Sequence, residues 1–145
     1  MLTKKAKYAL RALVVLAQDH DRALRAREVA TRARVPEKFL EAILVTLRQA
    51  GFVDSRRGLL GGHALARPAD RIAVGDIIRA IDGPLAPLRC ASVTAYQPCA
   101  DCPDPERCAL RGLMADVREA ISQVLDHQSL QQLAQRAQVL EAELA

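Results

Sequence analysis

Residues 35–66 read VPEKFLEAILVTLRQAGFVDSRRGLLGGHALA, and this stretch decides the fold. Its first half spaces apolar residues at helical intervals, which predicts a helix over 36–50. Pro36 suits the first helical position, because the N–H there has no intrahelical partner, and Gly51 ends the helix. Two short strands are then expected over 52–55 and 63–66, around a glycine-rich tip. The helix residues expected to face inward are Phe39, Leu40, Ile43, Leu44 and Leu47.

Two more helices are expected upstream, over about 4–19 and 25–33. Thr3 can cap the first, and Arg34 and Val35 connect the second tightly to the helix over 36–50. Two short helices joined by a few residues, the second with a polar outer face, form a helix-turn-helix. The hairpin that follows carries Arg56 and Arg57 at its tip, as the wing of a winged helix does. A phosphate-binding loop is excluded, because no Lys-Ser/Thr pair follows the glycines and no helix begins there.

Downstream, a helix is expected at about 74–80, and the triplet from Asp104 to Glu106 carries the signals that begin a long helix. Ser129 caps a last helix. A heptad stripe over this region can pack on the chain's own core, but a dimer interface is favoured because a complete small domain precedes it. The expected fold class is mainly α with a small β-hairpin wing: a winged helix-turn-helix over 1–83, a cysteine-rich loop over 84–104 and dimerisation helices over 105–145. The stripe consists of Leu110, Met114, Val117, Ile121 and Val124, continued by Leu133, Ala137, Leu140 and Leu144.

Charge is divided unevenly along the chain. Residues 1–67 hold 14 Lys and Arg against 6 Asp and Glu, whereas residues 68–145 hold 7 against 11. A basic first half indicates a polyanion partner, with a different function behind it. The N-terminus resembles no signal peptide and no apolar run is long enough to span a membrane, so a cytoplasmic protein is expected. No acid–base pair near a nucleophile and no nucleotide fingerprint is recognisable, which argues against an enzyme.

All four cysteines fall within 19 residues, spaced C-x8-C-x2-C-x5-C at Cys90, Cys99, Cys102 and Cys108. The stretch is rich in turn formers, and a thiol cluster on a loop is typical of metal binding or redox chemistry. Structural disulfides are less favoured, because nothing places the chain in an oxidising compartment. Four thiolates suit an iron–sulfur cluster, whereas the Cys99-x2-Cys102 half suits zinc equally well.

Five blocks, in this order and with the cysteines behind them, resemble the Rrf-two family of winged helix-turn-helix transcriptional regulators in its IscR-like and NsrR-like form. They are KYALRAL (7–13), VPEKFLE (35–41), LRQAGFV (47–53), SRRG (55–58) with the glycines at 61 and 62, and IAVGDIIRAI (72–81). The resemblance implies a homodimeric regulator of double-stranded DNA, expected to be a repressor. It also implies an iron–sulfur cluster, 2Fe–2S or 4Fe–4S, whose response to iron, nitric oxide or redox state sets the affinity for DNA.

The expected DNA-binding residues lie on the helix over 36–50, on the wing and on the first helix. Lys38, Glu41 and Ala42 fall on the helix face that would meet base edges. Arg57 matches a wing arginine that the family places in the minor groove. Tyr8, Arg11 and Arg48 would bind phosphates, which position the protein without reading sequence. The expected surface also includes Pro36 and Arg56.

In the resemblance, Cys90 and Cys108 match the outer cluster ligands, while Cys99 and Cys102 compete for the middle place or both bind. Some family members use a histidine three residues after the last cysteine. Here that position is Arg111, whose guanidinium stays protonated and is not a plausible ligand. The alternatives are a winged-helix regulator with a structural zinc, a cluster-free thiol switch, and a small electron-transfer protein, which would not need the basic helix-turn-helix.

Overall fold

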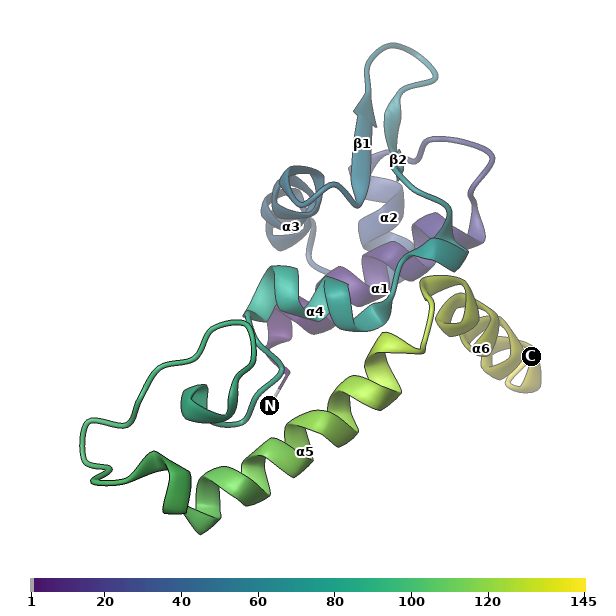
Figure 1. Cartoon of the computed structure of the whole chain (residues 1–145). Helices are drawn as coiled ribbons and strands as arrows, with labels where there is room; N and C mark the ends of the chain where they lie inside the picture. The colour runs from purple at the N-terminus through teal and green to yellow at the C-terminus, as the bar shows by residue number, and fades with distance from the viewer. Residues whose placement is uncertain (1) are drawn as a thin grey trace.

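The computed structural model describes residues 2–145 and consists of six α-helices, three short 3-10 turns and one two-stranded sheet (Figure 1). This mainly helical fold with a β-hairpin is the fold class expected from the sequence. No helix within residues 2–145 has both the length and the apolarity needed to cross a membrane. The helices and strands are α1 (Lys4–Gln18), α2 (Ala26–Ala33), α3 (Glu37–Gln49), β1 (Val53–Arg56), β2 (Gly62–Leu65), α4 (Val74–Asp82), α5 (Ala109–Asp126) and α6 (Leu130–Glu143).

Helix α1 is the central element, with α2, α3, α4 and α6 packed around it. Thr3 begins the helix, since its hydroxyl accepts a hydrogen bond from the Ala6 amide at 3.1 Å. One face of α1 is small and apolar, which lets neighbouring helices approach closely. The fully buried side chains around it are aliphatic and come from nearly every element: Leu13, Leu16, Leu24, Val29, Leu40, Leu47, Val53, Ile72, Ile77 and Leu130.

The turn between α2 and α3 depends on one unusual backbone conformation. Arg34 ends α2 with φ 54, a left-handed conformation that reverses the chain, and the Val35 amide then donates to the Ala30 carbonyl at 3.0 Å. Pro36 lies just outside α3 and not at its first position as expected, because its extended backbone makes it the N-cap. Its carbonyl accepts hydrogen bonds from the amides of Phe39 and Leu40.

Phe39 is the one residue of the expected inward stripe of α3 that does not face the core. Its side chain is 52% exposed, whereas Leu40, Ile43, Leu44 and Leu47 are buried. Successive residues in a helix are about 100° apart, so Phe39 lies to one side of the stripe centred on these residues. The prediction that Phe39 points inward was therefore wrong.

The wing is an antiparallel hairpin whose strands are each shifted by one residue from the expected ranges. Val53 pairs with Leu65 and Arg56 pairs with Gly62. At its base the hairpin is joined to the residues before α2, because Leu24 and His63 exchange two backbone hydrogen bonds of 2.8 and 2.7 Å. The returning strand thus pairs on both edges, which fixes the wing to the helix-turn-helix.

Helix α5 begins at Ala109 and not at residue 105. Residues Pro105–Arg107 form a separate 3-10 turn, capped by the carboxylate of Asp104. Cys108 has extended backbone (φ −84, ψ 110) that interrupts the helix, and it serves as the N-cap of α5 rather than lying in its first turn. Residues 104–106 do begin a helix, but it is a 3-10 helix that ends after one turn.

Helix α6 packs against α1, although the two helices come from opposite ends of the sequence (Figure 1). A capping box at Ser129 and Gln132 begins it. The Leu130 amide donates to the Ile72 carbonyl at 2.8 Å, and the Leu130 side chain is fully buried in the core that α1 centres. The division at residues 83 and 104 stays a prediction, but the last segment clearly contributes to the core of the first.

Candidate nucleic-acid interface and cysteine site

The outer face of α3 is free of intramolecular packing at the positions expected to meet DNA. Lys38, Glu41, Ala42 and Arg48 are all exposed, on the side of the helix opposite its buried leucines. The expected base-reading residues lie in the first half of α3, close to the exposed N-cap Pro36. The helix therefore presents a short polar ridge that protrudes from the body.

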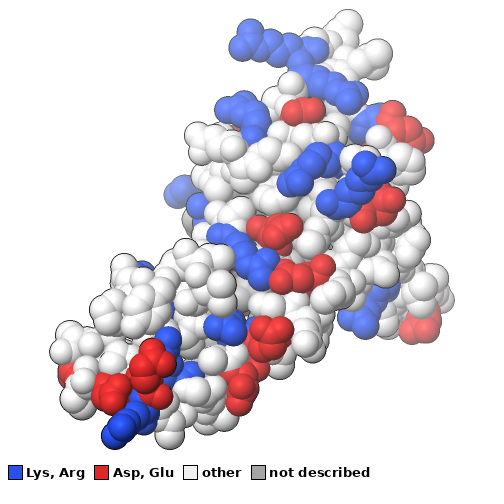
Figure 2. Space-filling view, in the orientation of Figure 1, with Lys and Arg blue, Asp and Glu red and all other residues white. Residues whose placement is uncertain are grey.

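The wing adds positive charge at one end of the molecule (Figure 2). Arg56 is the last residue of β1 and Arg57 follows it, and both side chains are exposed. Arg25, the residue at the N-cap position of α2, braces this tip. Its guanidinium donates to the carbonyls of Gly58 and Leu59 at 2.9 and 3.2 Å. An arginine where a cap residue is expected was the only sequence signal of this role.

The wing and α3 lie close enough for their charges to interact. The pKa of His63, on β2, is lowered by burial and by the positive charge of Arg48 on α3. His63 is thus neutral at physiological pH, with its Nδ1 3.3 Å from the Ser55 hydroxyl. A neutral imidazole at this position adds nothing to the positive charge of the wing.

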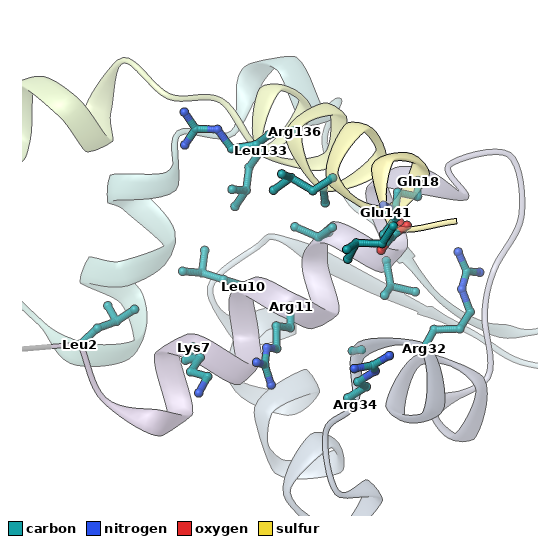
Figure 3. Close-up of a pocket in the computed structure, with 16 residues that line it drawn as sticks. Leu2, Lys7, Leu10, Arg11, Gln18, Arg32, Arg34, Leu133, Arg136 and Glu141 are labelled. Atoms are coloured by element: carbon teal, nitrogen blue, oxygen red, sulfur yellow. The ribbon is translucent and has the colours of Figure 1, made fainter.

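Tyr8 and Arg11 are expected to share a role, but they lie on different flanks of α1. Tyr8 lines a shallow apolar cavity of about 400 Å³ between α1 and α3, together with Phe39 and Ala42. Arg11 lines a larger groove of about 800 Å³ between α1 and α6, with Arg34 and Arg136 among its other cationic residues (Figure 3). Tyr8 is therefore next to the expected DNA-reading helix, whereas Arg11 borders the groove that α6 helps to form.

Several basic residues of the first half are engaged within the protein. Arg22 and Arg32 hold the Asp19 carboxylate at 3.1 and 2.7 Å, and Arg22 also binds Glu28 at 2.7 Å. The hydrogen bond from Arg32 is the main cause that lowers the pKa of Asp19. The guanidinium of Arg67 lies 4.8 Å from the ring centroid of Phe52, a cation–π contact. The net positive charge thus overstates the number of cations available to a partner.

The cysteine loop brings two of its four sulfurs together. The Sγ atoms of Cys90 and Cys99 are 3.8 Å apart; Cys90 is buried and Cys99 is exposed. The interaction with Cys90 is the main cause that raises the pKa of Cys99. Cys90 and Cys108 line one cavity of about 320 Å³. Cys102 is half-buried, and within residues 2–145 no three potential ligands gather closely enough to form a metal site.

Arg111 holds this loop against α5. Its Nε donates to the Cys90 carbonyl at 2.9 Å, and one Nη donates to the Pro105 carbonyl at 3.2 Å. Its backbone amide donates to the Cys108 sulfur at 3.4 Å, and its guanidinium lies 5.6 Å from the ring centroid of Tyr96. One residue therefore touches the backbone of one outer cysteine and the sulfur of the other. This explains why an arginine suits the position where some relatives of this pattern have a histidine.

The donor set fits a thiolate-bound cluster in kind and in number. Four cysteines can supply all the ligands of a 2Fe–2S or 4Fe–4S cluster. The shared cavity of Cys90 and Cys108 is lined by Arg111 and Arg118, whose positive charges would offset thiolate charge. Arg118 also donates to the Ala91 carbonyl, next to Cys90. The same donors fit zinc, and the residues alone do not favour one metal over the other.

Comparison with known proteins adds three kinds of finding. A family model described as "Rrf2: Iron-dependent Transcriptional regulator" matches residues 2–136. An rrf2-like HTH-type regulator of Rhodobacter capsulatus is 43% identical over 137 residues, which cover 92% of this chain and 91% of the relative. Two solved structures are similar along the whole fold. CymR, the global cysteine regulator of B. subtilis, has a TM-score of 0.77 and 32% identity, covering 94% of this chain and 97% of that one. IscR of T. potens has a TM-score of 0.75 and 28% identity, covering 94% and 88%.

Proposed function

The chain belongs to the Rrf2 family of transcriptional regulators, and on this basis we propose that it binds duplex DNA as a homodimer under the control of an iron–sulfur cluster. Its relatives are regulators of transcription and not enzymes. Regulation of promoters in the cytoplasm, as a repressor, is the form that we propose for this activity.

The exposed ridge of α3 beside the arginine wing is the observation that carries the DNA proposal. Lys38, Glu41 and Ala42 would meet base edges in the major groove, while Arg57 would enter the minor groove. Glu41 can accept a hydrogen bond from a cytosine amino group, which would give sequence preference. Tyr8, Arg11, Arg48, Arg56 and the exposed N-cap Pro36 complete the proposed surface.

Helix α5 supports the proposal of a homodimer. It has 18 residues and an amphipathic pattern, yet none of its residues is buried in the single chain. The apolar side chains left exposed along it are Leu110, Leu113, Val117 and Val124. Exposed apolar stripes of this length mark interaction sites, and a second copy of α5 is the partner whose stripe would match.

The cluster proposal rests on the thiols and on the family. The matching family model names iron, and four cysteines lie within one loop. Two of them, Cys90 and Cys108, line a cavity together with two arginines. Cys90 and Cys108 would be the outer ligands, with Cys99, Cys102 or both between them. When bound, the cluster would supply iron that exchanges electrons and reacts with nitric oxide. The loop connects the winged helix to α5. A change in the metal ligands of this loop would therefore alter the angle between the winged helix and α5.

A cluster-free thiol switch is the second candidate function. The contact between the sulfurs of Cys90 and Cys99 favours it, and one similar structure is that of a global cysteine regulator. A structural zinc remains the third form of the same regulator. All three share the DNA surface and differ only in what the loop holds.

Charge reversal on the wing tests the DNA surface. Arg57→Glu should weaken binding to a duplex selected from a random pool by about tenfold or more and should reduce the salt dependence of binding, because a cation is lost next to phosphates. Arg71→Glu makes the same charge change on an exposed residue outside the proposed surface, and it should leave affinity within about twofold. Glu41→Ala should change which sequences are preferred. Unchanged affinity and preference in both interface variants would exclude this surface.

Anaerobic reconstitution with iron and sulfide tests the loop. A cluster gives broad visible absorption with matching iron and sulfide content, whereas a colourless protein with stoichiometric zinc supports the structural-zinc form. Cys90→Ser and Cys108→Ser should each abolish the absorption, while Cys99→Ser and Cys102→Ser identify the middle ligand. The loaded and empty proteins should differ in affinity for the same duplex by about 5–150-fold. Equal affinities would show that the loop does not control DNA binding.

A further inference from the structure

We propose that Cys90 and Cys99, and not the closely spaced Cys99 and Cys102, are the redox pair of this loop, and that peroxide converts them into an intramolecular disulfide when the loop holds no metal. The pairing itself does not depend on the proposed cluster. Its consequence does, because the disulfide would consume Cys90, an outer ligand of the proposed cluster, together with Cys99, a candidate for the middle place.

The first argument is contact. The sulfurs of Cys90 and Cys99 lie 3.8 Å apart, which is van der Waals distance. A disulfide needs about 2.05 Å between sulfurs, and side-chain rotation on a loop can close that gap. Cys102 and Cys108 make no such sulfur–sulfur contact in the part of the chain that the structure describes. Between Cys99 and Cys102 there is only a backbone turn, with the Cys102 amide 3.4 Å from the Cys99 carbonyl.

The second argument is that the segment between the two thiols is closed by hydrogen bonds. Arg89 and Gln97 are joined twice: the Gln97 amide donates to the Arg89 carbonyl at 3.2 Å, and the Arg89 guanidinium donates to the Gln97 Oε1 at 2.8 Å. Inside this closure the Ser92 hydroxyl accepts from the Ala95 amide at 3.0 Å. Because Arg89 precedes Cys90 and Gln97 lies two residues before Cys99, the closure holds both thiols at the same place.

The third argument is that the two thiols differ in access. Cys90 is buried, and its carbonyl is held by Arg111 of α5, so it is the fixed member of the pair. Cys99 is exposed and is the member that an oxidant in solution meets first. A buried thiol next to an exposed one is the arrangement in which the second can be oxidised and the first can resolve it.

The chemistry balances with hydrogen peroxide as the oxidant. The Cys99 sulfur attacks one peroxide oxygen, the O–O bond breaks, and the departing hydroxide leaves as water with the thiol's proton. The Cys90 sulfur then attacks the sulfenic sulfur of Cys99, whose S–O bond breaks and releases a second water. Two thiols and one peroxide become one disulfide and two waters. A thiol reductant restores the two thiols, and until then the loop lacks at least the Cys90 thiolate that the proposed cluster would use.

Peptide mapping of the full-length, metal-free protein after treatment with one equivalent of peroxide and alkylation tests the pairing. Trypsin releases residues 90–107 as one peptide, and chymotrypsin then cuts it after Tyr96, separating Cys90 from Cys99 and Cys102. A Cys90–Cys99 bond keeps the two fragments linked, whereas a Cys99–Cys102 bond lets them separate. We expect linked fragments in the wild type and in Cys102→Ser, which rules out a Cys90–Cys102 bond, and none in Cys99→Ser.

Gln97→Ala tests the closure, with Gln131→Ala on exposed α6 as the matched control. Loss of the side-chain hydrogen bond to Arg89 should slow disulfide formation several-fold, and the control should form it at the wild-type rate. Separated fragments in the wild type, or linked fragments in Cys99→Ser, would overturn the proposal. The mapping uses no iron, so a protein that never takes up a cluster can still show the Cys90–Cys99 disulfide. A protein that binds a cluster but forms a Cys99–Cys102 bond would contradict the proposed pairing and leave the proposed cluster intact.

Discussion

Arg25 links the start of α2 to the tip of the wing through its long side chain. It stands at the N-cap of α2 without making a capping hydrogen bond, and its guanidinium instead reaches the carbonyls of Gly58 and Leu59 in the wing. The tip beyond these carbonyls is otherwise solvent-exposed, with Leu59 and Leu60 almost fully accessible. The brace therefore limits the directions in which the wing arginines can point.

Removal of the brace should affect DNA binding through mobility of the tip. Arg25→Ala should lower affinity for the selected duplex by a few fold, because the wing must then be ordered on binding, at a cost in conformational entropy. Backbone amides of residues 57–61 should exchange hydrogen faster. Arg27→Ala removes an exposed arginine from the same helix, so it separates this effect from simple loss of charge. Equal losses in the two variants would argue for charge alone.

Gly62 is required by both its backbone and its surroundings. Its φ is +142, which side chains rarely tolerate, and a Cβ there would collide with the backbone of Leu24. Gly62→Ala should lower the free energy of unfolding by about 1–3 kcal/mol, as expected for strain of this kind. Gly112→Ala is the control, because a Cβ there meets nothing within 4 Å and alanine favours a helix by about 0.5–1 kcal/mol. Denaturant unfolding should move the two variants in opposite directions.

At the scale of elements, the joint between α4 and α5 depends on an ion pair over a glycine. The Arg79 guanidinium binds both carboxylate oxygens of Asp126, at 2.7 and 2.8 Å. Gly75 lies directly beneath the Asp126 carboxylate, in a space that a Cβ would fill. A glycine is thus required at position 75, because the Asp126 side chain occupies the space that a Cβ would fill.

This ion pair should give the protein's stability a defined pH dependence. Arg79 lowers the pKa of Asp126 below its ordinary 3.8, so the unfolded chain takes up this proton at higher pH than the folded one does. The stabilisation is complete above about pH 4–5 and is lost as pH falls through the lower, folded pKa. Asp126→Asn should cost about 1 kcal/mol at neutral pH, since the pair is part-exposed, and the cost should shrink as pH falls below the ordinary pKa of 3.8 towards the lower, folded pKa. A cost that persists at low pH would mean that packing, and not charge, is lost.

Element boundaries could be predicted where signals are local, and less well where they depend on distant partners. Thr3 and Ser129 cap α1 and α6 as the residues indicate. The start of α5 was placed four residues early, because Asp104 and Pro105 begin a turn that the extended backbone of Cys108 then ends. In the cysteine loop, the spacing indicated that Cys99 and Cys102 could form half of a zinc site. The contact between Cys90 and Cys99 depends instead on hydrogen bonds within the loop, which no spacing rule describes.

At the scale of the whole molecule, the uncovered stripe of α5 predicts the assembly. Val117→Glu combined with Val124→Glu should convert a dimer into a monomer in sedimentation experiments, because two carboxylates would be buried without partners. Helical content should not change, since both side chains are exposed in the single chain. Gln123→Glu adds a carboxylate beside the stripe and should leave the dimer intact. A wild-type protein that sediments as a monomer would contradict the proposed assembly directly.

The packing of α6 on α1 has a consequence for biosynthesis. Leu130 belongs to the same hydrophobic core as Leu13 of α1, although the ribosome makes α6 later than the five other helices. The helix-turn-helix and its wing therefore emerge with one side of α1 still lacking its aliphatic cover. Such a nascent chain exposes apolar surface until α6 has emerged, and surfaces of this kind attract chaperones or aggregate. The DNA-reading module is thus completed only once α6 has been made, so a chain that stops before α6 leaves this side of α1 uncovered.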